Sequence, residues 1–175
     1  KAYSTAYLDS KPHTIKVYQL IENIVPVAIP STTGYATFSS QYPLDFTDIS
    51  TMNAYIAMAD GSTAVNFKRV RKVPANTGVL LVSTNGGAVA ETAVPYLTSD
   101  ADDVTGNVFV AVSAETNVPS TDTNVDNYIL NNGSHGIGFY QAAGNKVGAG
   151  KAYISLPTST QVKGFITLPG NDDET

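Results

Sequence analysis

Hydrophobic residues recur along the chain in short runs, each bounded by Gly, Pro, Asn or Asp. Short apolar or alternating runs between turn-forming residues are typical of β-strands, whereas amphipathic helices need longer segments with a helical period. Abundant Val, Tyr and Thr favour a pleated sheet in the same way. The pattern therefore predicts an all-β fold, an antiparallel β-sandwich or a barrel-like arrangement.

The predicted strands are residues 15–20, 34–38, 54–59, 65–73, 79–82, 108–112, 128–130, 137–140, 152–156 and 165–168. In 65–73 the apolar residues are spaced by three, which a β-bulge would reconcile with a strand. The uninterrupted apolar run 79–82 predicts a strand buried on both faces. A turn at 131–134 makes 128–140 the best hairpin candidate in the chain.

The sequence predicts the conformation of two connecting segments. Residues 74–78 (Pro-Ala-Asn-Thr-Gly) predict a tight turn, because Pro fixes φ and Asn and Gly tolerate positive φ. Residues 113–127 are rich in Thr, Asn and Asp and predict a long surface loop. Helix is expected only as a single turn around 46–51.

The length of 175 residues fits one domain, or two small subdomains packed as a unit. We expect a single β-rich module over residues 1–170. Residues 171–175 form an acidic segment that is typical of the start of a linker or tail.

Composition narrows the possible functions. The chain has no Cys, which excludes a disulfide framework, thiolate metal sites and a cysteine nucleophile. A net charge of −5 argues against nucleic-acid binding, and the one basic cluster, 68–72, divides between the two faces of a strand. No apolar stretch is long and uninterrupted enough to predict membrane insertion.

Catalytic chemistry has weak support. The two histidines, His13 and His135, lie in no nucleophile motif. Ser134 is next to His135 in the sequence, and adjacency alone does not produce the geometry of a catalytic triad. Asp45 and Asp48 lie in a polar, turn-like setting that favours solvated carboxylates over a general acid. We therefore expect no enzyme activity and no cofactor.

One acidic run suggests a metal alternative. Asp100, Asp102 and Asp103 could supply the loop oxygen ligands that Ca²⁺ takes. The EF-hand pattern fails, because Val104 occupies a position that needs an oxygen ligand. Solvated loop charges are the competing interpretation of this run, and a structural Ca²⁺ is the alternative.

The aromatic residues offer the strongest candidates for ligand binding. The chain has ten Tyr, six Phe and no Trp. Exposed planar rings can contact the apolar face of a sugar while polar neighbours bind its hydroxyl groups. The candidates are Tyr35, Tyr42, Tyr96, Tyr128, Tyr140 and Tyr153. The competing interpretation is that most of them are half-buried strand residues, and the lack of Trp counts against a strong glycan binder.

Several motifs occur together in a familiar order. They are GYATF at 34–38, YPL at 42–44, PANTGVLL at 74–81, GNVF at 106–109, YIL at 128–130, GFY at 138–140 and GKAYI at 150–154. Over residues 16–168 the chain resembles the β-rich accessory modules near the C-termini of secreted and surface proteins of Bacteroidetes, which include polysaccharide-degrading enzymes, leucine-rich-repeat surface proteins and adhesins. The resemblance implies a secreted or cell-surface location and a non-catalytic role, and it transfers no functional residues.

Two functions follow as expectations. The first is a carbohydrate-binding or substrate-targeting module, with a polysaccharide and the other domains of a larger parent protein as partners. The alternative is a structural spacer or cell-surface attachment module with no ligand of its own.

Overall fold

The computed structural model describes residues 23–61, 63–160, 162 and 164–170, and these residues contain strands and no helix. The all-β prediction is confirmed. The strands are β1 (Ile24–Ile29), β2 (Tyr35–Phe38), β3 (Leu44–Asp45), β4 (Met52–Asp60), β5 (Ala64–Val70), β6 (Lys72–Val73), β7 (Val79–Ser83), β8 (Val89–Pro95), β9 (Phe109–Val112), β10 (Thr116–Val118), β11 (Thr121–Asp122), β12 (Val125–Gly133), β13 (Gly136–Gln141), β14 (Asn145–Val147), β15 (Lys151–Pro157) and β16 (Phe165–Ile166).

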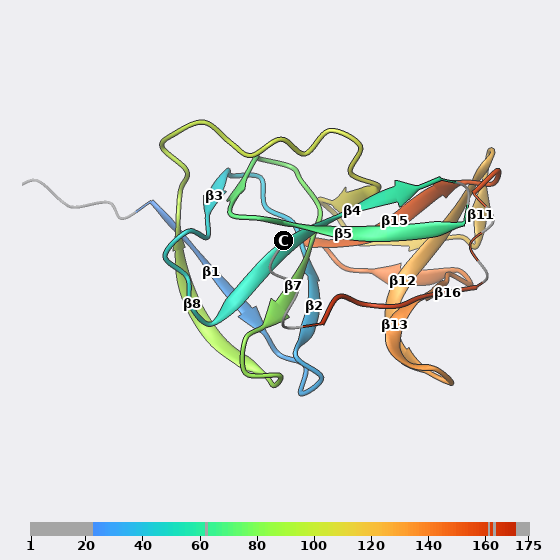
Figure 1. Ribbon diagram of the computed structural model, residues 1–175, viewed down its shortest axis with the longest axis horizontal. Coiled ribbons are helices and arrows are strands. Elements are labelled where there is room, and N and C mark those ends of the chain that lie inside the picture. The colour runs from blue at the N-terminus through green and yellow to red at the C-terminus, as the bar shows by residue number, and fades with distance from the viewer. Residues whose placement is uncertain (1–22, 62, 161, 163, 171–175) are drawn as a thin grey trace, which may run out of the picture.

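All strand pairs are antiparallel, and the sheets stay open rather than closing into a barrel. A four-stranded sheet, the middle sheet, has the order β2-β7-β4-β5. A second sheet has the order β16-β13-β12-β15-β9, with β11 added to β12. Two-stranded ribbons β1–β8, β3–β6 and β10–β14 complete the fold, with β1 and β8 at the opposite end of the molecule from β12, β13 and β16 (Figure 1).

The middle sheet separates two hydrophobic cores. Successive side chains on a strand point to opposite faces, so Ile56 of β4 enters the first core while Tyr55 and Ala57 enter the second. In β7, Leu81 lies in the first core and Leu80 in the second, and both are fully buried. The prediction that 79–82 is buried on both faces is confirmed.

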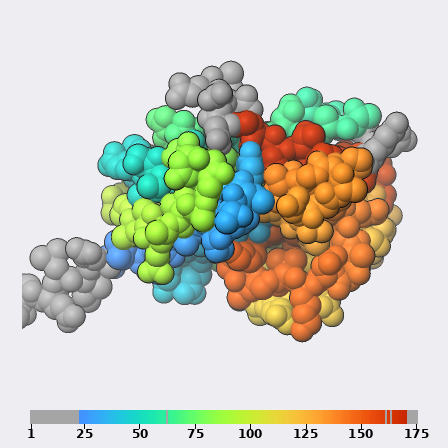
Figure 2. Space-filling model, turned by 90° about the horizontal axis from the view of Figure 1, so that it is seen from below, coloured from blue at the N-terminus to red at the C-terminus, as the bar shows by residue number. Residues whose placement is uncertain are grey.

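The two cores correspond to different parts of the chain. The first packs the β1–β8 ribbon against the middle sheet, and the second packs the second sheet against its other face. In the space-filling view the blue-to-lime atoms and the orange-to-red atoms form two adjoining halves, and the green tip of the β4–β5 hairpin extends over the second half (Figure 2). One shared sheet therefore joins both halves.

The conformation and packing of the turn at 74–78 account for its Asn and Gly residues. Asn76 has a φ of 57°, the left-handed conformation that Asn tolerates. A Cβ atom at Gly78 would lie 2.8 Å from the Cβ atoms of both Phe109 and Ala152. The predicted tight turn is confirmed, and Gly78 is needed because the turn lies directly against the second sheet.

Other sequence-based expectations need correction. The predicted strand 65–73 is interrupted at Arg71 and forms β5 and β6, while the predicted loop 113–127 contains β10 and β11 and the start of β12. At 46–51, where one helical turn was expected, Ile49 N–H donates to Phe46 O at 3.2 Å in an isolated turn, and no helix forms. The strands β1, β3, β8 and β14 were not predicted. Residues 15–20 and 171–175 lie outside the described residues.

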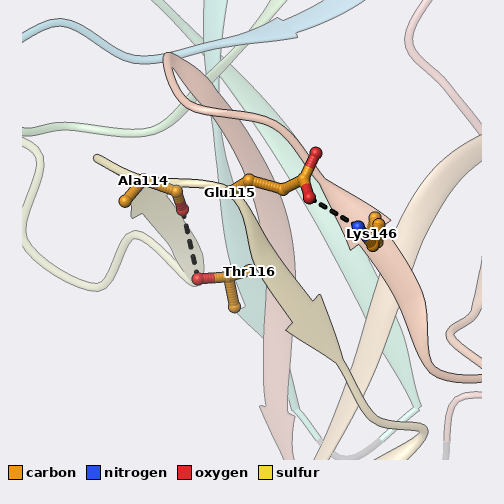
Figure 3. A network of polar contacts seen from close by, with 4 residues as sticks. All are labelled: Ala114, Glu115, Thr116 and Lys146. Carbon is orange, nitrogen blue, oxygen red and sulfur yellow. Dashed lines mark hydrogen bonds and ion pairs between the residues drawn. The ribbon is translucent and has the colours of Figure 1, made fainter.

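Within the predicted loop 113–127, β10 instead pairs with β14 in a two-stranded ribbon. Lys146 Nζ of β14 lies 2.8 Å from Glu115 Oε1, next to the start of β10, and Thr116 Oγ1 donates a hydrogen bond to Ala114 O (Figure 3). Beyond the ribbon, Asn127 of β12 donates its side-chain amide to Pro119 O and is 3% exposed. The segment after β10 is therefore fastened to the second sheet.

Candidate ligand-binding site

The outer face of the second sheet carries two aromatic rings side by side. Tyr140 of β13 is directly opposite Phe165 of β16 in the strand register. Their chain neighbours Phe139 and Ile166 lie in the second core, so Tyr140 and Phe165 point away from it. The ring centroids are 4.9 Å apart with an interplanar angle of 54°.

Glycines make room for both rings against the backbone. A Cβ atom at Gly133 would lie 2.7 Å from Cζ of Tyr140, and one at Gly138 would collide with the ring of Phe165. Since real Cβ atoms do not approach so closely, the rings can occupy these places only where side chains are missing. Each ring therefore lies against the β12–β13 hairpin.

The hydroxyl group of Tyr140 is held by the turn of the same hairpin. It accepts a hydrogen bond from the backbone N–H of His135 at 2.8 Å and donates one to the carbonyl oxygen of Gly136 at 2.7 Å. The imidazole of His135 lies 5.2 Å from the Phe165 ring and 6.4 Å from the Tyr140 ring. We call His135, Tyr140 and Phe165 the aromatic triad.

Apolar side chains continue from the triad across the sheet. Ile129 of β12 is opposite Tyr140, and Tyr153 of β15 is opposite Val110 of β9. Their chain neighbours Tyr128, Ile154 and Phe109 lie in the second core, so these three residues also face outward. Phe165, Tyr140, Ile129, Tyr153 and Val110 form what we call the outer row.

An uncharged amide borders the triad. Asn131 is opposite Gly138, over which the Phe165 ring lies, and its exposed side chain is on the same outer face. Amide groups donate and accept hydrogen bonds at once. The site thus combines fixed ring faces with a neutral hydrogen-bonding group.

Tyr42 and Tyr96, two of the sequence-predicted candidates, form a separate pair. Their rings stack with centroids 4.7 Å apart and an interplanar angle of 19°. Tyr96 bridges to Leu44 and packs against the first core, while Tyr42 is 41% exposed. Loss of solvent around its ring, with the nearby Tyr42, raises the pKa of Tyr96.

Tyr35 and Tyr128 belong to the interior side of the fold. Tyr35 packs against the second core and donates its hydroxyl to Pro169 O at 3.2 Å. Tyr128 is 2% exposed, and its hydroxyl donates to Val162 O at 3.2 Å. Burial raises the pKa of Tyr128. Neither the ring face nor the hydroxyl of Tyr128 is open to a ligand.

The three aspartates of the predicted metal site have separate surroundings. Asp102 Oδ2 accepts hydrogen bonds from the backbone N–H groups of Arg71 and Lys72, at 2.7 and 3.0 Å, where β5 gives way to β6. A hydrogen bond from Thr105 lowers the pKa of Asp103, and Asp100 is exposed. Within the described ranges, no three His, Cys, Asp or Glu side chains form a metal-binding group.

Of the groups considered for catalysis, His135 belongs to the triad and the two carboxylates do not. Asp45 Oδ1 accepts the backbone N–H of Thr47, and hydrogen bonding from Thr47 holds the pKa of Asp45 below its ordinary value. Asp48 is exposed, and His13 lies outside the described residues. Among the residues that the structure describes, no helical segment has the length and apolar character to cross a membrane.

Sequence reasoning selected Tyr140 but not its partners His135 and Phe165. The available signal was glycine at 133 and 138 within otherwise strand-like segments, since a strand glycine often marks a close approach. The fold and this face define an open, layered antiparallel β protein of the sandwich type. Comparison with protein-family models, curated proteins and solved structures found no match for this chain.

Proposed function

We propose that this chain is a non-catalytic accessory module that binds carbohydrate through the aromatic triad. The observation that carries the proposal is the pair of rings, Tyr140 and Phe165, seated on glycines 133 and 138 with the amide of Asn131 beside them. The C–H face of a sugar gains apolar contact on such rings, and neighbouring amides bind its hydroxyl groups.

Preorganisation favours this use of the site. Binding is weakened when side chains must be ordered as the ligand arrives, at about 0.5–1.5 kcal/mol for each flexible side chain. The Tyr140 ring is fixed by two hydrogen bonds at its hydroxyl and by the backbone at Gly133 beneath it. Little freedom remains to be lost when a sugar stacks on it.

The outer row points to a glycan chain rather than a single sugar. It crosses five strands, β16, β13, β12, β15 and β9. Four inter-strand spacings of about 4.8 Å give a span of about 19 Å. A polysaccharide lying across the strands could use this length, and a monosaccharide could not.

The setting of the module is part of the proposal. We place it in a secreted or bacterial surface protein, attached to other domains that it would target to a polysaccharide. The support is the resemblance of motifs such as PANTGVLL to the accessory modules of Bacteroidetes proteins.

Polysaccharide pull-down with matched variants tests the function. Against insoluble and soluble plant and host glycans, the chain should bind at least one polymer. Phe165→Ala should weaken that binding by about fivefold, because it removes a stacking surface worth on the order of 1 kcal/mol. Ile24→Ala, which removes an exposed apolar side chain of β1 outside the triad and the outer row, is the control and should bind as before.

Two results would overturn the proposal. One is no binding to any polymer of a broad panel. The other is equal weakening by Phe165→Ala and Ile24→Ala, which would exclude the triad as the site. Thermal unfolding of each variant shows that the folded protein is being compared.

The second candidate is a structural spacer, and one observation favours it. Both cores share the middle sheet, with Tyr55, Ile56, Leu80 and Leu81 each no more than 1% exposed, so the two halves form a stiff unit. A spacer predicts that deleting the module from its parent leaves the activity of the neighbouring domain on polymeric substrate unchanged.

A further inference from the structure

A polar cleft lies on the chain away from the aromatic triad. Its volume is about 540 Å³, and its walls come from segments 39–41 and 111–113 together with Asn76 and Gly150. Pockets of about 300–1,000 Å³ are the usual size of small-molecule sites. The cleft is therefore large enough for a small ligand.

Backbone hydrogen bonds hold the walls of this cleft together. Ser39 N–H donates to Gly150 O at 2.8 Å, and Gly150 N–H donates to Val112 O at 2.7 Å. On the other side, Asn76 N–H donates to Ser40 O at 2.7 Å. Segments far apart in the sequence are thus tied to one another, and the cleft is already formed before any ligand arrives.

The side chains that line the cleft carry no charge. Ser39 Oγ donates to Lys151 O and Ser40 Oγ accepts the N–H of Tyr42, so these two hydroxyls are already used. The side chains of Gln41, Asn76 and Ser113 are exposed and make no hydrogen bond with other described residues. Two amides and one hydroxyl are therefore free to bind a ligand.

An apolar ring accompanies these polar groups. Tyr42 follows Gln41 directly, is 41% exposed and is held against Tyr96 by stacking. Its backbone N–H is fixed to Ser40 Oγ at 2.9 Å. The wall at 39–41 is thus followed in the chain by an ordered, exposed ring that lies outside the lining of the cleft.

We propose that the cleft is a second ligand site that takes one sugar unit of a neutral saccharide. Neutral amides and hydroxyls suit a ligand rich in hydroxyl groups, and the lack of a lining cation gives no partner to a carboxylate or sulfate. The site is separate from the triad and does not depend on it, so the chain can hold a single sugar unit at one place and a glycan chain at another.

Asn76→Gly is a sharp test because glycine keeps the backbone conformation. Asn76 has a φ of 57°, which glycine adopts freely, so the substitution removes the amide and little else. Asn124→Gly is the matched control, since Asn124 also has positive φ, 64°, and does not line the cleft. Ser113→Ala is a second, independent variant on an exposed position.

The experiment is an NMR titration of the 175-residue chain with glucose, galactose, mannose and N-acetylglucosamine, and with glucuronate as the charged comparison. At least one neutral sugar should shift the backbone amide signals of Ser40, Asn76 and Ser113 in a saturable way. Asn76→Gly and Ser113→Ala should each weaken binding by about threefold to tenfold, as expected for one lost hydrogen bond. Asn124→Gly should bind as the parent does.

The outcomes separate this proposal from the proposed function. No saturable shift around the cleft with any neutral sugar, or tighter binding of glucuronate, would overturn it. Shifts that disappear in Phe165→Ala and persist in both cleft variants would assign the sugar to the triad and also overturn it. Binding at the cleft that survives Phe165→Ala supports it, even if every polymer fails to bind the triad.

Discussion

At the scale of single residues, glycines determine where rings and turns can pack closely in this molecule. Gly133 and Gly138 let rings rest on the hairpin, and Gly78 lets a turn lie against Phe109 and Ala152. The same residue type thus builds a surface site in one place and joins two parts of the fold in another.

The role of Gly78 yields a prediction about stability. Gly78→Ala should lower the free energy of unfolding by about 1–3 kcal/mol, because the new methyl group meets two side chains of the second core at 2.8 Å. Gly148→Ala is the control, since a Cβ there meets nothing within 4 Å, and it should change stability by less than about 0.5 kcal/mol. Chemical denaturation measures both, and equal effects would contradict the close approach.

The sequence could not decide which tyrosine faces outward from the second sheet. Tyr128, Ile129 and Leu130 are all apolar, as are Phe139 and Tyr140, so alternation does not say which face of β12 and β13 is the core. The structure puts Tyr128 in the core and Tyr140 on the outer face. Long-range pairing with β15 and β16 determines which face of β12 and β13 points to the core, and the local sequence pattern does not contain this information.

At the scale of elements, strands with unbroken apolar or alternating patterns were predicted, whereas β1, β8, β10 and β14 were not. β7 was recognised from its four apolar residues. β1 contains Pro26, β8 ends at Pro95, and β10 and β14 are short and polar. Proline is confined to sheet edges and bulges, and these strands lie in two-stranded ribbons where a missing donor can be tolerated.

The β10–β14 ribbon does not rely on its ion pair. The side chains of Lys146 and Glu115 are 69% and 60% exposed, so water screens their attraction. Glu115→Gln should therefore change the free energy of unfolding by less than about 0.5 kcal/mol. A loss several times larger in chemical denaturation would show that the pair matters more to the ribbon than its exposure implies.

At the scale of the whole molecule, the central feature is one sheet with a hydrophobic core on each face. Residue patterns and turn signals predicted the all-β class and some of the strands, including the double burial of β7. The assignment of β5 to the edge of the middle sheet and of β9 to the edge of the second sheet depends on contacts distant in sequence. Such pairings follow from the packing of two cores, which no single segment specifies.

The buried Tyr128 should make the free energy of unfolding depend on pH in the alkaline range. Burial raises its pKa above the ordinary value of 10.0 in the folded state, so the folded protein retains this proton where the unfolded chain loses it. The associated stability is complete below pH of about 10 and is lost as pH rises through the folded pKa. Tyr128→Phe should flatten the fall of the unfolding free energy above that pH.

At neutral pH, Tyr128→Phe should be less stable than the parent protein. Removing the hydrogen bond to Val162 O should lower stability by about 1 kcal/mol. Some alkaline dependence should remain, because the pKa of Tyr96 is also raised. Denaturant titrations at neutral and alkaline pH measure both effects, and an unchanged alkaline slope in Tyr128→Phe would contradict this assignment.

The central claim is that the outer face of the second sheet binds a glycan chain through His135, Tyr140 and Phe165. The most direct measurement is the NMR spectrum of the ring protons of these residues during titration with whichever polysaccharide the pull-down selects. We predict saturable shifts of all three rings, while the ring signals of the core residue Tyr128 stay in place. Binding that leaves the triad signals unmoved would contradict the claim.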